Sequence, residues 1–229
     1  EAGYRSFGES RPESSEEQDR QLLAWYDDPE GRRLNMVGNM VAMTLRSRCA
    51  WRWSFAVTDP DTVGFIAELG PLIEVGAGTG WWAHRITTAG GDIIATDVAP
   101  TKGSRRRNSW HDGAPSWHRV HPVDAATAAG THPERTLFVC WAPYSEPMGA
   151  DAVAAYHQAG GKKVVVIGEG PSGCTGDDRF FELLGEDRWH DPKDESERPR
   201  SEALFRQVTG HRMLSWFGIR DDLYVYERV

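Results

Sequence analysis

A glycine-rich segment behind an acidic residue is the part of this sequence best suited to hold a ligand. Leu72–Val75 is apolar except for Glu74, and Gly76-Ala77-Gly78-Thr79-Gly80 follows directly. Glycines at alternate positions let backbone pass close to a ligand, because no Cβ blocks the approach and positive φ costs little. An acid inside an apolar strand suggests that a polar group is held beside it. The segment therefore predicts a ligand-binding turn between a strand and a helix.

The spacing Gly-x-Gly-x-Gly after Glu74 resembles the first motif of class I S-adenosylmethionine (SAM)-dependent methyltransferases. The resemblance implies that SAM lies across the turn, beside Glu74, Gly76, Ala77, Gly78 and Gly80. The rival dinucleotide-binding fingerprint ends on a glycine at the start of the helix, close to the pyrophosphate. Trp81 occupies that position here, and its indole would crowd the phosphates. NAD-dependent oxidoreduction is disfavoured further by the lack of an evident catalytic Lys, Ser–Tyr or zinc set.

Two aspartates follow the next expected strands, at the sheet edge where ligands of open α/β folds bind. Asp97 ends the strand expected over residues 92–96, and an ionised carboxylate offers two oxygens to two ribose hydroxyls. The resemblance gives this role to Asp97, with Val98 beside it. It also implies that Asp124 takes the adenine amino group while the backbone of Ala125 meets the ring. The alternative for each aspartate is a turn or a helix cap.

The segment Cys140-Trp141-Ala142-Pro143-Tyr144 follows the fourth expected strand. The resemblance places Cys140 and Trp141 beside the sulfonium and its methyl group, where the face of Trp141 or Tyr144 attracts a cation. The alternative is a rigid proline turn with core aromatics. Methyltransferases that act on DNA or glutamine carry Asn/Asp-Pro-Pro-Tyr here. This chain keeps only the Pro-Tyr part, which argues against nucleic-acid and amide-nitrogen substrates.

The spacing of apolar runs predicts alternating strands and helices beyond Gly70. Strands are expected over residues 72–75, 92–96, 117–122, 136–141 and 163–168, and helices over 81–88, 150–158 and 177–184. Such alternation predicts a doubly wound α/β sheet with parallel strands. Residues 213–227 predict a terminal hairpin that turns at Arg220-Asp221-Asp222. The resemblance implies a mostly parallel, Rossmann-like sheet of seven strands that ends in this antiparallel hairpin.

The chain before the sheet divides by composition into two parts. Residues 1–20 are polar and predict a mobile arm. Residues 21–69 predict an N-terminal helical extension, with helices near 18–26, 35–48 and 59–69, the last capped by Asp59 or Asp61. The SAM-binding domain then spans residues 70–229, with an exposed loop over 186–202. The extension could act as a lid on its own pocket or on a partner's, which leaves a homodimer through these helices open.

Composition argues against several classes of protein. A net charge of −8 over 229 residues disfavours a general nucleic-acid binder, which neutralises phosphates with Lys and Arg. The run Arg105-Arg106-Arg107 is interpreted as a solvated loop, with a patch for an anionic partner as the alternative. Three cysteines form neither a disulfide framework nor a metal-binding pair, which favours a reduced, cytoplasmic setting. No apolar run is long enough for a membrane span or a signal peptide, although the first residue, Glu1, leaves a trimmed leader open.

Four segments are similar to one actinobacterial branch of the superfamily. They are Trp53–Val57, Gly70–Ala83, Gly168–Gly170 and Gly173–Asp177. Small members of that branch methylate indole C3 in tryptophan-containing cyclodipeptides while a pyrroloindoline ring closes. The resemblance implies a small-molecule substrate of this kind. The alternatives are an O- or N-methyltransferase of another small natural product, and a SAM-binding module without catalysis.

This chemistry needs a base, because an indole or amide N–H loses its proton as the ring closes. The candidate bases are Tyr26, His111, His118, His121, Tyr144 and Glu169. We expect a relay of Tyr26, from the helical extension, with His121 and an acid, Asp124 or Glu169, that orients the imidazole. The alternatives are helix packing for Tyr26 and an ordinary strand-end position for His121. The spacing of the three histidines fits no common zinc pattern, so no metal is expected.

Overall fold

The computed structural model describes residues 29–171, 173–186, 203–216 and 218–229. The chain divides into two compact units, residues 1–45 and 46–229, so residues 46–69 lie in the same unit as the sheet. The helix α2 (Pro29–Arg52) contains the helix that was expected over residues 35–48. The expected arm, the helix near residues 18–26 with Tyr26, and all of the expected 186–202 loop except its first residue lie outside the described residues.

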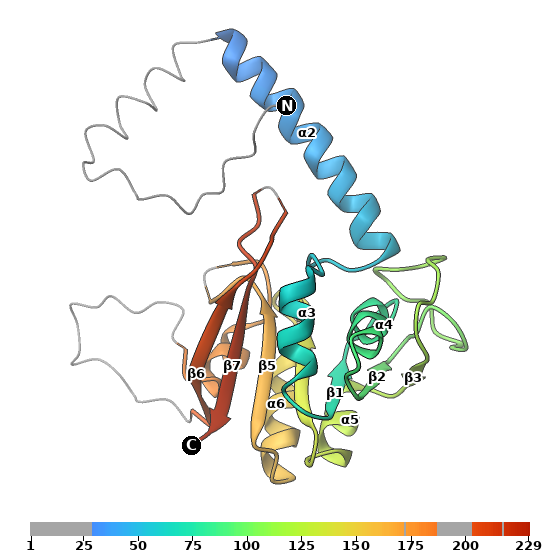
Figure 1. Ribbon diagram of the computed structural model, residues 1–229, viewed down its shortest axis with the longest axis vertical. Coiled ribbons are helices and arrows are strands. Elements are labelled where there is room, and N and C mark those ends of the chain that lie inside the picture. Colours follow the sequence, from blue (N-terminus) through green and yellow to red (C-terminus); the bar gives the residue numbers. More distant parts are fainter. Residues whose placement is uncertain (1–28, 172, 187–202, 217) are drawn as a thin grey trace, which may run out of the picture. The chain divides into compact units, whose positions relative to one another are not determined.

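Within the described residues of the second unit, seven strands form one sheet (Figure 1). They are β1 (Leu72–Val75), β2 (Ile93–Asp97), β3 (Val120–Pro122), β4 (Thr136–Cys140), β5 (Lys163–Gly168), β6 (Phe205–Arg212) and β7 (Asp222–Arg228). Their spatial order is β3-β2-β1-β4-β5-β7-β6. The first five strands are parallel, whereas β7 runs antiparallel to β5 and β6. This arrangement confirms the doubly wound, Rossmann-like α/β fold expected of class I methyltransferases, with its terminal antiparallel hairpin.

Helices cover both faces of the sheet. Those of the second unit are α3 (Pro60–Ala67), α4 (Trp81–Thr88), α5 (Ala125–Thr131), α6 (Met148–Gln158) and α7 (Asp178–Leu183). One core joins α3 and α4 to the sheet, and a second core joins α5, α6 and α7 to its other face. Double coverage explains why strands such as β5 are apolar along almost their whole length.

Side chains alternate between the two faces along β1. Ile73 and Val75 belong to the core under α5, α6 and α7, whereas Leu72 belongs to the core under α3 and α4. Glu74, two residues after Leu72, therefore lies on the face that α3 and α4 cover. All four residues of β1 are buried, so the single acid of this strand is enclosed along with its apolar neighbours.

Aspartates begin three of these helices. The side chain of Asp59 accepts a hydrogen bond from Thr62 N at 2.9 Å, which confirms the expected cap of α3. Asp124 caps α5 and Asp177 caps α7 in the same way. The sequence did not predict α5, because its residues Ala-Ala-Thr-Ala-Ala-Gly-Thr show no strong apolar periodicity. Small side chains allow α5 to pack closely against α6.

The terminal hairpin begins earlier than expected. Its first strand is β6, at residues 205–212, and residues 213–216 form no strand. The expectation was wrong because β6 is an edge strand exposed at every residue except Phe205, and so carries no alternating apolar pattern. The apolar run after β6 serves the core instead. Met213 packs against the core under α3 and α4, and the Trp216 indole donates to Phe55 O at 2.9 Å.

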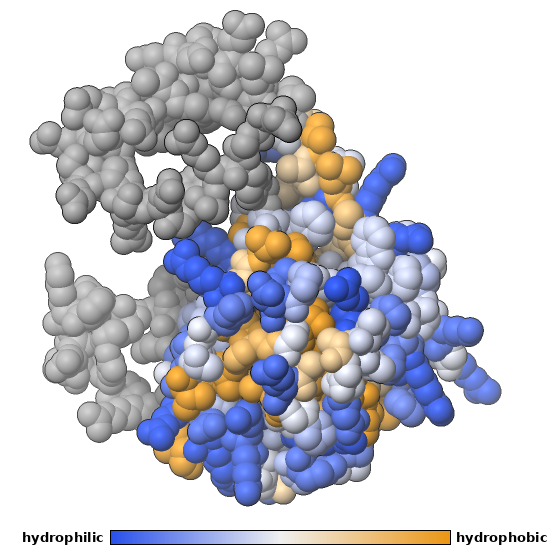
Figure 2. Space-filling view, in the orientation of Figure 1, coloured by the Kyte–Doolittle hydropathy of each residue, from blue (hydrophilic) through white to orange (hydrophobic). Residues whose placement is uncertain are grey.

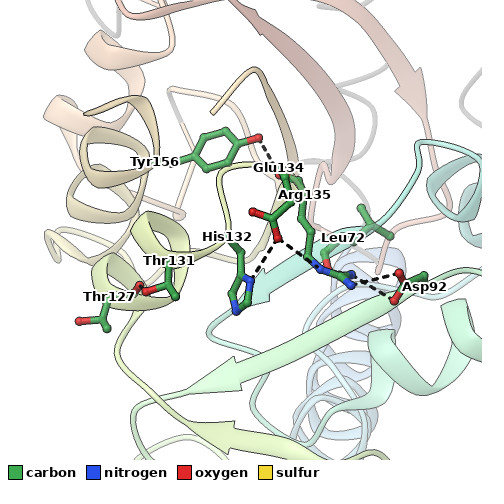
Figure 3. Close-up of polar contacts among 8 residues, drawn as sticks. All are labelled: Leu72, Asp92, Thr127, Thr131, His132, Glu134, Arg135 and Tyr156. Atoms are coloured by element: carbon green, nitrogen blue, oxygen red, sulfur yellow. Dashed lines mark hydrogen bonds and ion pairs between the residues drawn. The ribbon is translucent and has the colours of Figure 1, made fainter. Parts of the chain in front are cut away.

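A polar cluster ties strands together at the amino-terminal edge of the sheet (Figure 3). The Arg135 guanidinium contacts both carboxylate oxygens of Asp92 at 3.1 Å and also donates to Leu72 O at 3.2 Å. The Tyr156 hydroxyl donates to Arg135 O at 2.7 Å. These contacts join the starts of β1, β2 and β4 through side chains. The opposite, carboxyl-terminal edge holds the cleft described below.

The face of the protein in Figure 2 is largely hydrophilic, with smaller hydrophobic areas between the charged side chains. Among the described residues, α2 carries several exposed large apolar side chains: Met40, Val41, Met43, Leu45 and Trp51. None of the described helices combines the length and the apolar character needed to cross a membrane.

Candidate functional site

A cleft of about 580 Å³ opens at the carboxyl ends of β1, β2 and β4. Ten of the residues predicted to bind a cofactor or substrate line it: Glu74, Gly76, Ala77, Gly78, Asp97, Val98, Ala125, Cys140, Trp141 and Tyr144. Two further segments contribute several residues each to the walls, residues 53–55 and residues 106–111. The cleft therefore gathers most of the predicted residues at one sheet edge, where open α/β folds bind ligands.

The glycine turn runs through three left-handed positions. Gly76, Gly78 and Gly80 have φ values of +67°, +54° and +75°, which favour glycine at each position. The structure gives Gly80 a packing role, because it begins α4 and an added Cβ would lie 2.9 Å from Val120 Cγ2. Gly80 is not among the residues that line the cleft, whereas Gly76 and Gly78 are.

Glu74 is a buried acid, and one of its carboxyl oxygens has no hydrogen-bond partner. Its exposed fraction is 2%, and its Oε2 atom has no hydrogen-bond partner. Burial, with a further contribution from the nearby charge of Asp97, raises the pKa of this carboxyl from 4.5 to about 8. The backbone amide of Ala83, in the first turn of α4, opposes this rise. An enclosed acceptor of this kind is costly unless a donor meets it, so Glu74 fits a cationic or N–H group of a ligand.

Asp97 joins the end of β2 to the glycine turn. Its Oδ2 accepts from Gly78 N at 2.9 Å, and its Oδ1 accepts from Ala99 N at 2.8 Å. Each carboxylate oxygen has two acceptor sites, so one remains on each oxygen for a ligand. The two backbone bonds hold the carboxylate in one orientation at the wall of the cleft. This geometry suits two neighbouring hydroxyl groups, as the sequence predicted for Asp97.

Trp141 forms a platform at the end of β4. Its φ of +55° is uncommon for a residue other than glycine. The ring stacks on Phe55, with centroids 5.3 Å apart and planes inclined by 20°, and the Arg46 guanidinium lies 5.0 Å from its centroid. The indole N–H donates to Asp221 Oδ1 at 2.8 Å. Trp141 is thus held from three sides in a strained conformation, which is typical of functional sites.

Sequence reasoning missed Asp221, treating it only as part of a turn. It is buried, its Oδ2 has no partner, and burial with a smaller contribution from Glu169 raises its pKa to about 7. Its partner Trp141 lies far away in the sequence, so no local signal connects the two. Cys140 is half-buried, and desolvation raises the pKa of its thiol, so it stays protonated at neutral pH.

The connection between β2 and β3, residues 98–119, contains no helix. Asn108 organises it: its Oδ1 accepts from the backbone amides of Trp110 at 2.9 Å and His111 at 2.8 Å, and its amide donates to Ala99 O at 2.8 Å. The segment supplies Trp110 and His111 to the cleft. The sequence had named His111 as a candidate base but not Asn108 or Trp110. The length of the segment without an expected strand or helix is a further signal, because long irregular loops are frequently functional.

The predicted catalytic residues do not all come together. Tyr144 lines the cleft, but Glu169 lines a neighbouring pocket of about 720 Å³ that shares only Tyr144 and Cys174 with the cleft. Glu169 accepts from Cys174 N, Cys174 Sγ and Arg220 N at 2.9 to 3.0 Å. These partners lower the pKa of Glu169, although burial opposes them.

His121 and Asp124 are not among the residues that line the cleft. His121 lies in β3 opposite Thr96, and the Asp124 carboxylate accepts from Thr127 N at 3.0 Å as the cap of α5. The structure thus places Asp124 in the capping position that the sequence left open as its alternative. Tyr26 lies outside the described residues. Within the described part of the chain, no group of three or more His, Cys, Asp or Glu side chains could hold a metal ion.

No protein-family model and no curated protein matches this chain. Among solved structures it is similar to magnesium protoporphyrin IX methyltransferase from Synechocystis PCC 6803 with bound SAM, at 9% identity and a TM-score of 0.45 over 94% of this chain and 92% of that one. It is also similar to 1,6-didemethyltoxoflavin-N1-methyltransferase from Burkholderia thailandensis, at 11% identity and a TM-score of 0.39 over 96% and 92% of the two chains. An rRNA methylase from Streptococcus thermophilus is similar at 11% identity and a TM-score of 0.39, over 76% of this chain and 98% of that one. Similarity at this level does not distinguish between activities.

Proposed function

We propose that this protein is a SAM-dependent methyltransferase that acts on a small molecule. The observation that carries the proposal is the cleft itself, in which one glycine turn, the oriented carboxylate of Asp97 and the open Oε2 of Glu74 meet. A nucleoside with a cationic amino-acid tail matches these groups. SAM is such a molecule, and when bound it supplies a methyl group on a positively charged sulfur.

Different residues of the cleft bind different parts of the cofactor. Asp97 accepts hydrogen bonds from the two ribose hydroxyls, and Glu74 accepts from the ammonium group of the tail. Val98 and Ala125 border the adenine. Trp141 offers its ring face near the sulfonium, where a cation is attracted. Gly80 and Asp124 are not included among the proposed cofactor-binding residues, because they are the N-caps of α4 and α5 and do not line the cleft.

The acceptor lies against an aromatic wall. Trp53, Phe55, Trp110 and Trp141 all line the cleft. Flat aromatic side chains bind planar rings well, which favours an aromatic acceptor. We propose indole C3 of a tryptophan-containing cyclodipeptide, with closure of a pyrroloindoline ring, as the specific reaction. Methylation of oxygen or nitrogen on another small aromatic is the second candidate, since the same wall accepts it.

Two measurements test this function in order. Titration calorimetry with SAM and with S-adenosylhomocysteine asks whether the cleft holds the cofactor. Mass spectrometry then follows SAM incubated with cyclo(Trp-Trp) and, separately, with a panel of simple phenols. A product heavier by one methyl group from cyclo(Trp-Trp) supports the specific reaction, and methylation confined to the phenols supports the second candidate. SAM binding without any product would favour a binding module, and absence of SAM binding contradicts the proposal as a whole.

A homodimer through the N-terminal helices is a further part of the proposal. The exposed apolar residues Met40, Val41, Met43 and Leu45 on α2 support it, because such side chains gain free energy when a partner covers them. Light scattering coupled to gel filtration should give a mass near twice 25.6 kDa. A monomer at high protein concentration would contradict this part alone.

A further inference from the structure

We propose that His111 is the proton acceptor of the methyl-transfer reaction, its Nε2 atom receiving the proton that the acceptor molecule loses. This inference rests on the proposed function and gives the role of base to a residue other than His121. It is drawn from the position of the imidazole, from its fixed tautomer and from its being the only imidazole among the described residues that line the cleft.

The position of His111 is fixed by its backbone and by its ring. Asn108 Oδ1 accepts from its backbone amide at 2.8 Å, and only 7% of the residue is exposed. Its ring packs on Gly78, where an added Cβ would lie 2.7 Å from Nε2 and from Cδ2. The absence of a side chain at Gly78 is what admits the imidazole. His111 therefore sits directly over the glycine turn, at the wall of the cleft.

The tautomer of His111 follows from its other ring nitrogen. Nδ1 lies 3.0 Å from the carbonyl oxygen of Trp51. A carbonyl oxygen can only accept, so Nδ1 must carry the hydrogen. Nε2 of the neutral ring is then left with a free lone pair. The Trp51 carbonyl plays the part that an orienting acceptor plays for other catalytic histidines.

The surroundings keep the imidazole neutral. Burial lowers the pKa of His111, although its hydrogen bond to Trp51 and the charge of Asp97 oppose this. Besides Asp97, the other charged or titratable groups on the cleft wall include Glu74 on β1 and Arg106 and Arg107 on the 98–119 segment. The rest, among the described residues, are Cys140, Tyr144, Glu146 and Cys174. Arg107 is paired with Asp112 at 2.7 Å. A neutral imidazole is ready to take a proton at neutral pH.

Four other titratable groups in the cleft are less suited to accepting this proton. Burial raises the pKa of the Cys140 and Cys174 thiols, the latter to about 11, so neither is a thiolate at neutral pH. Glu74 keeps its proton up to about pH 8, and both oxygens of Asp97 are engaged by backbone amides. Among the described residues that line the cleft, His111 is the only imidazole.

His111 also borders the aromatic wall. Its ring centroid lies 5.6 Å from that of Phe55, which in turn stacks on Trp141 at 5.3 Å. An acceptor ring held by this wall is therefore near Nε2. In the step proposed, the nucleophilic atom bonds to the methyl carbon and the carbon–sulfur electron pair stays on sulfur as a neutral thioether. The proton leaves the acceptor for His111 Nε2, giving an imidazolium that later loses it to water.

Two substitutions separate the ring nitrogens. His111→Asn places an amide N–H close to the position of Nδ1, so it can keep the bond to Trp51 O while removing the basic lone pair. His111→Gln instead extends a non-basic amide toward the position of Nε2. The matched control is His132→Asn, a histidine at the amino-terminal edge of the sheet that pairs with Glu134 (Figure 3). With the acceptor that the wild type methylates, both His111 variants should lose about 10²- to 10³-fold in kcat.

The same variants should bind SAM within about threefold of the wild type, since a proton acceptor acts on the nucleophile and not on cofactor affinity. In the wild type kcat/KM should fall at acidic pH as the imidazole is protonated, and this limb should be missing in His111→Asn. A variant with unchanged kcat, or one whose whole defect is weaker SAM binding, overturns the proposal.

A spectroscopic measurement tests the protonation state of His111 without requiring turnover. Long-range proton–nitrogen NMR spectra of the wild type should show His111 as the neutral Nδ1–H tautomer at pH 7, with Nε2 unprotonated. An Nε2–H tautomer or an imidazolium at that pH would overturn the role of His111. Calorimetry with SAM on the same sample distinguishes a failure of the proposed function from a failure of the role proposed for His111. Failure to bind SAM contradicts the proposed function, whereas SAM binding with the wrong tautomer contradicts only His111.

Discussion

Replacing Glu74 with Gln should stabilise the free protein and weaken its binding of SAM. Folding raises the pKa of this buried carboxyl from 4.5 to about 8. The unfolded chain therefore releases the proton from about pH 4.5 upward, while the folded chain keeps it until about pH 8. For an acid whose pKa is raised by folding, the contribution to stability is present below pH 4.5 and is lost as pH rises toward 8.

The size of the effect follows from the two pKa values. A tenfold change in an acid constant corresponds to about 1.4 kcal/mol, so a rise from 4.5 to about 8 costs the folded state about 5 kcal/mol at alkaline pH. At pH 7 the cost is about 3 kcal/mol by the same reasoning. Gln has nearly the same shape but cannot ionise, so the variant should escape this cost. The loss of a charge-assisted hydrogen bond should weaken SAM binding by about tenfold.

Urea unfolding at pH 5 and pH 8.5 measures the prediction. The wild type should lose about 4 kcal/mol more free energy of unfolding between these two values than Glu74→Gln does. Glu182→Gln is the matched control, because Glu182 is exposed on α7. If Glu74→Gln keeps the full pH dependence of the wild type, Glu74 is not the enclosed acid described above. A variant that is stabilised but binds SAM as tightly as the wild type would separate Glu74 from the cofactor.

Three further substitutions test the cleft. Asp97→Ala should weaken SAM binding about 30-fold or more, because two hydroxyl partners and the anchor of Gly78 are lost; calorimetry that gives the wild-type affinity would reject Asp97 as the ribose ligand. Gly78→Ala should lower the free energy of unfolding by about 1–3 kcal/mol, because φ is +54° and the new Cβ meets the His111 ring; a chemical denaturation curve equal to that of the wild type would contradict this packing. Trp141→Phe should cost about 1–3 kcal/mol by leaving buried Asp221 without its donor; an unchanged melting temperature would show that this bond contributes little.

The strands and the glycine turn could be predicted because their signals are local. β1 and β5 begin and end at the expected residues, since a short apolar run bounded by turn residues specifies a buried strand by itself. The turn at Gly76–Gly80 needs left-handed backbone, and glycine adopts it most easily. The edge strand β6 was not predicted, because its side chains after Phe205 are exposed and its sequence shows no apolar alternation. The helix α5 escaped because its close packing relies on small residues.

Part of the cleft could not be predicted from the order of strands along the chain. Asp97 and Trp141 were predicted because each ends a strand, and parallel strands bring their carboxyl ends to one edge. His121 was also expected at a strand end, yet it is not among the residues that line the cleft, because it belongs to β3, an edge strand three positions from β4. His111 comes from an irregular connection and owes its place to Asn108, Gly78 and the Trp51 carbonyl.

The amino-acid sequence alone determined the five parallel strands in outline, the glycine turn and the carboxylate at the end of β2, because each depends on residues close together in the chain. Tertiary structure decided which base meets the cleft, what holds Trp141 in place and how strongly Glu74 resists ionisation. These depend on burial and on contacts between distant segments, such as that of Trp141 with Asp221. Burial depends on the neighbours that folding supplies, and no residue carries that information by itself.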